Sequence, residues 1–364
     1  MPLLPMVGHQ EPRQRLAGAL EKGRFPHSIL VSGPQGVGKQ RFALWVAQML
    51  VCERARKGEE GRERARAEGP CGECGSCRRV LGLAHPDVHW MVPIPRPKAG
   101  DADRQVEDAA EALAEVMGER REQPLWTAPD GMAIHGVATA RLILRRMALT
   151  SVEGGPKVFI VGGAERLVPQ ESSPEAANAL LKGIEEPPRD TVVILTAADP
   201  SRVLPTIRSR MVPFRLGRLS DDEVRSFLVE HLRPAPKGTA LDVLVRVAEG
   251  SIGRALAEGS AAAKVRDAAA SLLGLIEEGK GRWIERALQQ APWQARGEFS
   301  EMLAALGALL EERIRTAGSQ DGRTEALVEA IEKVEAAREA AQGNVNPQLL
   351  LAVLADDLEE RLCD

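Results

Sequence analysis

The sequence from residue 28 to residue 51 places a glycine-rich turn between a buried strand and a helix. The apolar run SILVS is followed by GPQGVGKQ, and the apolar stretch at 42–51 has the length of a helix. The turn fits the spacing G-x-x-x-x-G-K, in which backbone N–H groups and a helix N-terminus hold phosphate oxygens while the lysine neutralises their charge. Its residues Gly33, Gly36, Gly38, Lys39 and Gln40 are the candidates for a nucleotide site, which is degenerate for the reasons given below.

Two further apolar runs, VFIV at 158–161 and VVILT at 192–196, are typical of buried strands. Helix-like segments such as 175–185 separate these runs along the chain. Buried strands that alternate with helices favour an α/β fold with a doubly wound parallel sheet. Because 364 residues exceed what one hydrophobic core usually organises, we expect two or three domains.

The chemistry that normally accompanies such a loop is missing. Gln40 stands where a serine or threonine hydroxyl would bind Mg²⁺, and an amide replaces that hydroxyl poorly. The run at 158–161 continues into Gly162 and Gly163, at the positions where acidic side chains hold the metal and orient the attacking water. Glu165 follows too late and falls on the outgoing turn. We therefore expect no ATP hydrolysis; the loop is either a structural turn or a weak nucleotide site.

Helical segments follow the α/β part. Ser220 and Glu223 form a capping-box pattern at the start of a helix over 221–231, and Gly250 ends the next helix. From residue 261 onward Ala, Leu, Glu and Arg dominate. In that region breaks are expected at Pro292, Gly318 and Gly343, and a helix start at Pro347 after Asn346. The predicted domains are an α/β core over 1–216, a small helical lid over 217–260 and an all-helical domain over 261–364.

An acidic, helix-like piece at 96–131 interrupts the α/β core. Its ends are rich in proline and glycine. We interpret it as a surface insertion, most simply a tolerated loop extension.

Three cysteines crowd into CGECGSC, which forms two C-x-x-C turns that share one sulfur. With Cys52 they supply four thiolates, which suit a tetrahedral Zn²⁺ ion. The intervening segment is too polar for a core, so the metal would staple a small loop-rich module over about 52–80. An iron–sulfur cluster and unmetallated thiols are the alternatives, although the C-P continuation of iron–sulfur motifs is missing. The predicted zinc ligands are Cys52, Cys71, Cys74 and Cys77, whereas Cys363 stands alone.

The composition limits how the chain can act on DNA. A formal net charge of -4 and a pI near 6.0 argue against a surface that supplies its own DNA-binding field. There is no Tyr and aromatics total 3%, so a stacking platform for single strands is not expected. No apolar run approaches the roughly 18 residues of a membrane span, and the start lacks a secretory signal pattern. We expect a cytoplasmic protein without a membrane partner, in which any role on DNA runs largely through other proteins.

Three segments resemble the AAA+ subunits of bacterial clamp loaders of the DNA polymerase III holoenzyme. They are VGHQEPRQRLAGALEKGRFPHSILVSGPQGVGK, ESSPEAANALLKGIEEPP and TAADPSRVLPTIRSRMVPFRL. The resemblance covers residues 7 to about 258 with one interruption and is most specific at 178–188. It implies an AAA+ core with a zinc module after the first P-loop helix, and a C-terminal helical collar through which subunits oligomerise.

The resemblance also implies a role in trans for Arg210. Ser209-Arg210-Met211 matches the family's Ser-Arg-Cys motif except for the methionine, and in the family this arginine reaches the ATP phosphates of a neighbouring subunit. The lid places Gly253 where the ATPase subunits carry a sensor arginine. A chain that has lost its own nucleotide chemistry and kept the trans arginine would assist its partners. The implied partners are gamma/tau-like ATPase subunits, a delta-like subunit and, through the assembly, the sliding clamp and primed DNA.

Three other interpretations remain open from the sequence. The chain could be an active clamp-loader ATPase of the gamma/tau-like type, against which the glycines at 162 and 163 argue. It could also be a stand-alone nucleic-acid-binding protein that uses the zinc knuckle, although the acidic balance disfavours this. Arg210 itself could be an ordinary salt-bridged surface residue.

Overall fold

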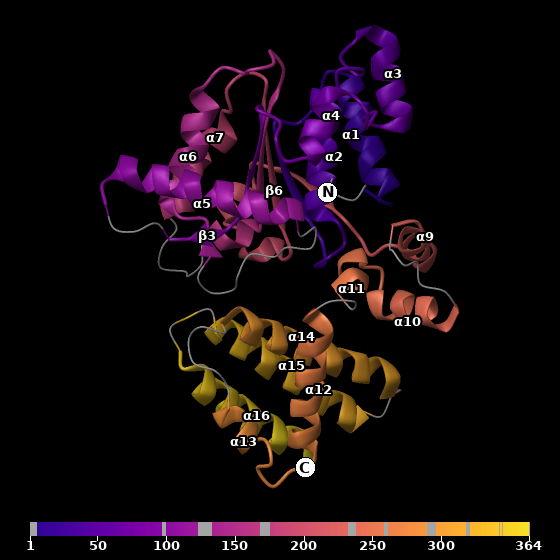
Figure 1. The fold of residues 1–364 in the computed structure, drawn as a ribbon, viewed down its shortest axis with the longest axis vertical. Helices are drawn as coiled ribbons and strands as arrows, with labels where there is room; N and C mark the ends of the chain where they lie inside the picture. Colours follow the sequence, from indigo (N-terminus) through magenta and orange to yellow (C-terminus); the bar gives the residue numbers. More distant parts are fainter. Residues whose placement is uncertain are drawn as a thin grey trace. The chain divides into compact units, whose positions relative to one another are not determined.

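The computed structural model describes residues 6–96, 100–122, 133–167, 175–231, 238–257, 261–289, 296–317, 321–341, 343 and 345–363. The chain divides into two compact units, the first running to Leu256 and the second beginning at Ala257 (Figure 1). Each unit has its own hydrophobic core, so each is described by itself.

The first unit is built on a five-stranded parallel sheet. The three central strands are buried at every position, as expected for strands covered on both faces. This confirms the parallel sheet expected from the apolar runs. The two edge strands carry too short an apolar signal to be recognised in the sequence. In spatial order the strands are β2 (Val88–Met91), β5 (Lys157–Gly162), β6 (Thr191–Ala197), β1 (Ser28–Ser32) and β7 (Val212–Arg215).

Helices cover both faces of this sheet (Figure 1). On one face α2 (Lys39–Val51) packs on β1, β5 and β6 through a nearly continuous row of buried side chains. On the other face α6 (Val137–Ala148) and α7 (Glu175–Glu185) pack against each other. The remaining elements of this region are α1 (Gln10–Glu21), α3 (Gly58–Glu68), α4 (Gly75–Leu81), η1 (Ala164–Leu167), η2 (Pro200–Arg202) and α8 (Pro205–Arg208).

The segment interpreted as a surface insertion is part of the core, so that interpretation was wrong. It contains α5 (Ala102–Glu122), which contacts α6 and the short antiparallel pair β3 (Ile94–Pro95) and β4 (Ala133–Ile134). A buried side chain recurs every three or four residues along α5, which gives the helix an apolar face. These side chains are Val106, Ala109, Leu113 and Met117, all in the main hydrophobic cluster. Residues 123–131 of the predicted insertion lie outside the described residues.

Three short helices follow the sheet and enclose a small hydrophobic cluster of their own, which includes Val224, Phe227 and Val245. The predicted capping box is confirmed: the Glu223 side chain accepts the Ser220 N–H at 2.9 Å, and the Ser220 hydroxyl accepts the Glu223 N–H at 3.3 Å. The helices are α9 (Asp221–His231), α10 (Gly238–Ala248) and α11 (Ile252–Ala257).

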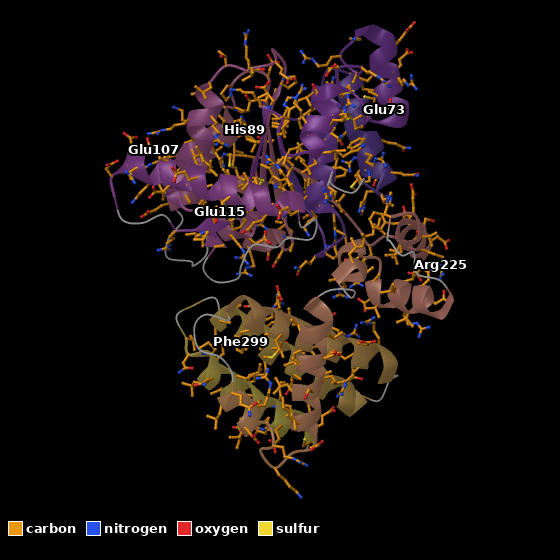
Figure 2. All side chains as sticks on the ribbon, in the orientation of Figure 1. Glu73, His89, Glu107, Glu115, Arg225 and Phe299 are labelled. Atoms are coloured by element: carbon orange, nitrogen blue, oxygen red, sulfur yellow. The ribbon has the colours of Figure 1, made fainter. Side chains whose placement is uncertain are left out.

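Among its described residues, the second unit consists of helices joined by turns and contains no strand. Phe299 lies among its helices and is 3% exposed (Figure 2). The predicted helix start at Pro347 is confirmed, because the Asn346 side chain accepts the N–H of Gln348 at 2.9 Å. The expected breaks at Pro292 and Gly318 lie outside the described residues. The helices are α12 (Ala261–Glu277), α13 (Ile284–Leu288), α14 (Arg296–Ala317), α15 (Asp321–Ala341) and α16 (Pro347–Cys363).

Across both units, no described helix combines the length and apolar character needed to cross a membrane.

Candidate functional site: a degenerate phosphate loop, an exposed arginine and a cysteine cluster

The glycine-rich turn lies between β1 and α2 and has the backbone conformation of a phosphate-binding loop. Gly36 and Gly38 have φ angles of 77° and 101°, which L side chains rarely adopt. The Lys39 ammonium donates to the carbonyls of Gly33 and Pro34, each at 2.7 Å. Burial lowers the pKa of Lys39 to about 8, with the Glu165 carboxylate acting in the opposite direction. The lysine is therefore held at the loop, where it can meet an anion.

The position where Mg²⁺ would sit offers no suitable ligands. A side chain built on Gly162, at the end of β5, would begin 3.0 Å from the Gln40 amide nitrogen and 3.4 Å from the Trp90 indole nitrogen. The Gln40 side-chain oxygen accepts a hydrogen bond from the guanidinium of Arg120. Mg²⁺ needs oxygen ligands in octahedral geometry, and here it would meet an amide, an indole and a cation. These residues do not fit a magnesium ion.

The second glycine after β5 provides only backbone at this edge of the sheet. The Gly163 N–H donates to the hydroxyl of Thr196 at 3.3 Å, which joins the ends of β5 and β6. Glu165 lies in η1, as the sequence predicted, and its carboxylate accepts the N–H of Ala198 at 3.2 Å. The second oxygen of that carboxylate is buried without a partner among the described residues. No carboxylate therefore stands at either strand-end position.

The lid helices contact the loop directly. The Gly253 N–H donates to the Gly36 carbonyl at 3.0 Å, and the Ser251 hydroxyl donates to the Gln35 carbonyl at 3.2 Å. A Cβ on Gly253 would lie 2.7 Å from the Gly36 Cα, so this approach needs glycine. Arg254, the next residue, forms an ion pair with Glu249 at 2.5 Å.

Arg210 lies at the turn between α8 and β7, with its side chain 40% exposed. It forms an ion pair with Glu185 at the end of α7, and it donates to the Thr206 carbonyl at 2.8 Å. The Ser209 hydroxyl also donates to that carbonyl, at 3.1 Å. Met211, which replaces the motif's cysteine, is buried in the main core. Because Met211 is anchored in the core, the adjacent Arg210 is held at the surface of the first unit.

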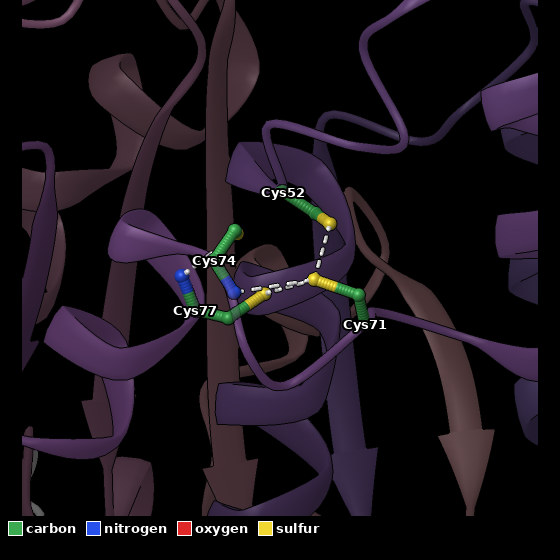
Figure 3. Close-up of side chains that lie close together, drawn as sticks. All are labelled: Cys52, Cys71, Cys74 and Cys77. Atoms are coloured by element: carbon green, nitrogen blue, oxygen red, sulfur yellow. Dashed lines mark hydrogen bonds between the residues drawn. The ribbon is translucent and has the colours of Figure 1, made fainter.

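The four predicted metal ligands come together, with their sulfur atoms all within 4.8 Å of one another (Figure 3). The Cys71 sulfur lies 3.6 Å from that of Cys52 and 4.0 Å from that of Cys77. Four thiolates at the usual zinc–sulfur distance of about 2.3 Å would stand about 3.8 Å apart, so the spacing fits a tetrahedral metal. The four cysteines therefore form a site that could hold a metal ion.

Backbone N–H groups favour the thiolate state of Cys71, whereas burial raises the pKa of Cys52 and of Cys77. Cys71 accepts the N–H of Cys74, and Cys74 accepts the N–H of Cys77, each at 3.4 Å. Burial by itself raises the pKa of Cys71, but hydrogen bonds from the N–H groups of Cys74 and Glu73 bring that pKa down to about 7. Cys363 lies elsewhere, and its sulfur contacts the Ile276 carbonyl.

The module around the cysteines is more regular than expected. Cys52 directly follows α2, the polar segment forms α3 (Gly58–Glu68), and Cys74 caps α4 (Gly75–Leu81). The prediction of a loop-rich module was therefore wrong. The segment is too polar for a core, as the sequence indicated, but a helix of this kind needs only one packed side, and α3 contacts α1.

The fold and the loop define the class: a P-loop α/β protein with a helical lid. The profile of the family described as DNA polymerase III, delta subunit, matches residues 8–220, more than half of the chain. The chain belongs to this family.

The curated relatives include subunits named delta' and subunits named tau. The DNA polymerase III subunit delta' of Pseudomonas aeruginosa is 31% identical over 191 residues, which cover 52% of this chain and 43% of the relative. That of Bacillus subtilis is 27% identical over 59% of this chain and 49% of the relative. The DNA polymerase III subunit tau of Escherichia coli is 28% identical over 79% of this chain and 38% of the relative. The chain thus spans less than half the length of each of these relatives.

A solved structure of a DNA polymerase III gamma subunit-related protein from Thermotoga maritima aligns with 95% of this chain and 99% of its own, with a TM-score of 0.42 and 14% identity.

The sequence predicted the glycine-rich loop and, separately, the cysteine cluster. It gave no indication that Arg120 and Trp90 lie at the loop. Both residues reach the metal position from elements whose placement depends on long-range packing. The one available signal was a basic pair at the end of an otherwise acidic amphipathic helix, which is also a common way to end a helix.

Proposed function

We propose that this chain is a non-hydrolysing AAA+ clamp-loader subunit of the delta-prime type. It acts in the cytoplasm within a DNA polymerase III assembly, lends Arg210 to the ATP site of a neighbouring ATPase subunit and helps place a sliding clamp on primed DNA during replication. The observation that carries the proposal is that Gly162, Gly163 and Gln40 leave the chain's own site without a metal ligand. Delta' is also the name of several of its curated relatives.

Arg210 has the properties that a trans-acting arginine needs. Its guanidinium is exposed, and its present partner is the carboxylate of Glu185, which is 39% exposed. An exposed ion pair of this kind contributes at most about 1 kcal/mol to folding, so little stability opposes its exchange for a phosphate group. A guanidinium matches the geometry of phosphate oxygens and can form paired hydrogen bonds with them.

We further propose that the four cysteines hold zinc as a structural ion. With four thiolates the ion has no open coordination position, so it would supply cross-linking and no catalysis. It would join the end of α2 to the start of α4 around the polar helix α3.

The second unit would serve as the oligomerisation collar. Leu349 and Val353 lie one helical turn apart on α16, and their side chains are 62% and 54% exposed. Leu288 on α13, which contacts α16, is 67% exposed. Large apolar side chains that gather on an exposed surface are typical of interfaces with other proteins.

The test is a clamp loader reconstituted with gamma/tau-like and delta-like subunits that contains Arg210→Ala. Loss of an arginine finger slows the site it serves by a factor on the order of 10³ or more, so total ATPase should fall partially and clamp loading at least as much. Arg208→Ala is the matched control, because Arg208 is equally exposed on α8 and donates only to the Pro200 carbonyl among its described contacts. Wild-type ATPase and clamp loading in an assembled Arg210→Ala complex would exclude the trans role.

A second candidate is an active ATPase subunit, favoured by the longer match to the tau subunit of Escherichia coli. It is distinguished by phosphate release from ATP by the isolated chain. Turnover that Lys39→Ala abolishes would establish the ATPase type, whereas absence of turnover agrees with the delta-prime type.

A further inference from the structure

The inserted helix α5 delivers a guanidinium to the phosphate loop. Arg120, near the C-terminal end of the helix, is 6% exposed although it carries a charge. Its guanidinium carbon lies 4.1 Å from the centre of the Trp90 ring, and it donates to the side-chain oxygen of Gln40. The helix is fixed by the apolar face that it buries in the main core, so the position of Arg120 is determined by packing.

The contacts place this guanidinium where a P-loop holds its metal ion. Gln40 occupies the position of the metal-binding hydroxyl, and Trp90 and Gln40 both approach Gly162 at the position of the metal-binding carboxylate. Arg120 contacts both of these side chains. The positive charge at this position thus comes from the Arg120 side chain, where a metal-dependent P-loop has a divalent cation.

Further donors around the loop are without acceptors. One guanidinium nitrogen of Arg41 and the indole nitrogen of Trp90 are buried and have no hydrogen-bond partner among the described residues. Trp90 is 7% exposed, and its indole nitrogen faces the end of β5 at Gly162. Buried donors that stay unpaired cost free energy, so this arrangement favours a ligand made of acceptors.

The same region also gathers positive charge. Burial lowers the pKa of Arg120 to about 9, and the nearby guanidinium of Arg41 lowers it further. Burial likewise lowers the pKa of Arg41 to about 10. Lys39 is held at the loop by its two carbonyl contacts. Buried cations that lie close together are stabilised by a bound anion.

We propose that Arg120 takes the place of the metal ion and that the loop binds a nucleotide polyphosphate without a divalent cation. The guanidinium of Arg120 would contact phosphate oxygens from the side where a metal ion normally stands, while Lys39 and the loop N–H groups contact them from below. A metal-bound nucleotide is excluded, because its divalent ion would be placed against Arg120 with no carboxylate at the strand-end positions 162 and 163 to bind it. The site thus holds a ligand that it cannot hydrolyse.

The experiment measures ATP binding to the isolated chain by calorimetry, once in buffer freed of divalent cations before the protein is added and once in excess Mg²⁺. No chelator is used, so that zinc held by the cysteines stays in place. The expected result is binding without Mg²⁺ that is at least as tight as binding with Mg²⁺, the reverse of a metal-dependent P-loop. No binding in the absence of Mg²⁺, or binding that requires Mg²⁺, would overturn the proposal. Tripolyphosphate in place of ATP shows whether the phosphates alone are recognised, and failure of both ligands counts against the site.

Variants assign the effect to the guanidinium. Arg120→Met keeps an apolar stem over Trp90 and removes the charge. It should weaken ATP binding in the absence of Mg²⁺ by about tenfold to a hundredfold, since hydrogen bonds to charged groups are of that strength. Arg121→Met is the matched control, because Arg121 is exposed and donates to the Leu83 carbonyl away from the loop. Equal affinities of the two folded variants would overturn the role of Arg120.

Should Arg120→Met fail to fold, the comparison of ATP binding with and without Mg²⁺ on the unmodified chain still decides the proposal. The measurement uses the isolated chain and does not involve Arg210, so its outcome is separate from that of the trans-arginine test.

Discussion

The backbone N–H of Gly253 in the lid donates to the carbonyl of Gly36 in the phosphate loop at a distance of 3.0 Å. This contact joins two elements that are far apart in the sequence and belong to different hydrophobic clusters of the first unit. It also occupies the position from which the family's ATPase subunits are expected to extend a sensor arginine. At this point the lid contacts the loop through the Gly253 backbone, whereas an active site would need the arginine side chain there.

Restoring that arginine should therefore destabilise the first unit. In Gly253→Arg the new Cβ would meet the Gly36 Cα at 2.7 Å, which the backbone cannot accommodate without a shift. Overpacking of this kind typically costs about 1–3 kcal/mol. Chemical denaturation checks the change, and Gly217→Ala is the control, because a Cβ on Gly217 meets nothing within 4 Å. Equal stability of the two variants would show that the lid readily moves away from the loop.

Purified protein should contain one zinc ion per chain, held by Cys52, Cys71, Cys74 and Cys77. Elemental analysis measures the content directly. Cys74→Ser should lose the ion, because three thiolates remain and the cap of α4 is changed. Cys363→Ser should keep it, since that sulfur contacts only backbone carbonyls among its described contacts. Iron in place of zinc, or unchanged content in Cys74→Ser, would contradict the assignment.

Stability should fall in mild acid because of a buried histidine. Burial lowers the pKa of His135 to about 4, and its ring nitrogen lies 2.8 Å from the Gly162 carbonyl. The unfolded chain takes up this proton near pH 6.5 and the folded chain does not, so the free energy of unfolding decreases as the pH falls. The expected loss is on the order of 2 kcal/mol between about pH 7 and about pH 5.

Urea unfolding at a series of pH values measures this loss. His135→Gln should flatten the acid limb relative to the wild type, whereas His27→Gln, at an exposed histidine, should not. Parallel pH profiles for wild type and His135→Gln would assign the acid sensitivity to other groups.

Assembly should depend on the apolar surface of the second unit. Leu349→Glu places a charge at the most exposed large apolar residue of α16, which should reduce co-purification with gamma/tau-like subunits. The fold should remain intact, because the side chain is 62% exposed. Val243→Glu, at a valine of the first unit that is 46% exposed, should leave assembly unchanged. Normal assembly of Leu349→Glu would move the interface elsewhere.

Local features of this protein could be predicted from the sequence. The strands β1, β5 and β6 were visible as continuous apolar runs, and the capping box at Ser220 follows from residues three positions apart. The cysteine cluster was also visible, since the spacing of CGECGSC leaves few ways to place its sulfur atoms. In each case the interacting residues are close in the sequence, or the pattern repeats with the period of the element.

Tertiary structure decided the features that join distant segments. The segment at 96–131 looked like a surface insertion because it is acidic and its ends are rich in proline and glycine, yet four apolar side chains on one face of α5 pack into the main core. Edge strands β2 and β7 gain their hydrogen bonds from neighbours that no local pattern reveals.

The phosphate site shows the same division. The sequence by itself determined that Gln40, Gly162 and Gly163 cannot hold a metal ion, because the identity of a side chain decides its ligand chemistry. Only the tertiary structure decided what stands there in place of the ion, since Arg120 lies eighty positions from Gln40 and is brought to it by the packing of α5. Residue types define which chemistry is absent, whereas packing between distant elements defines which groups meet.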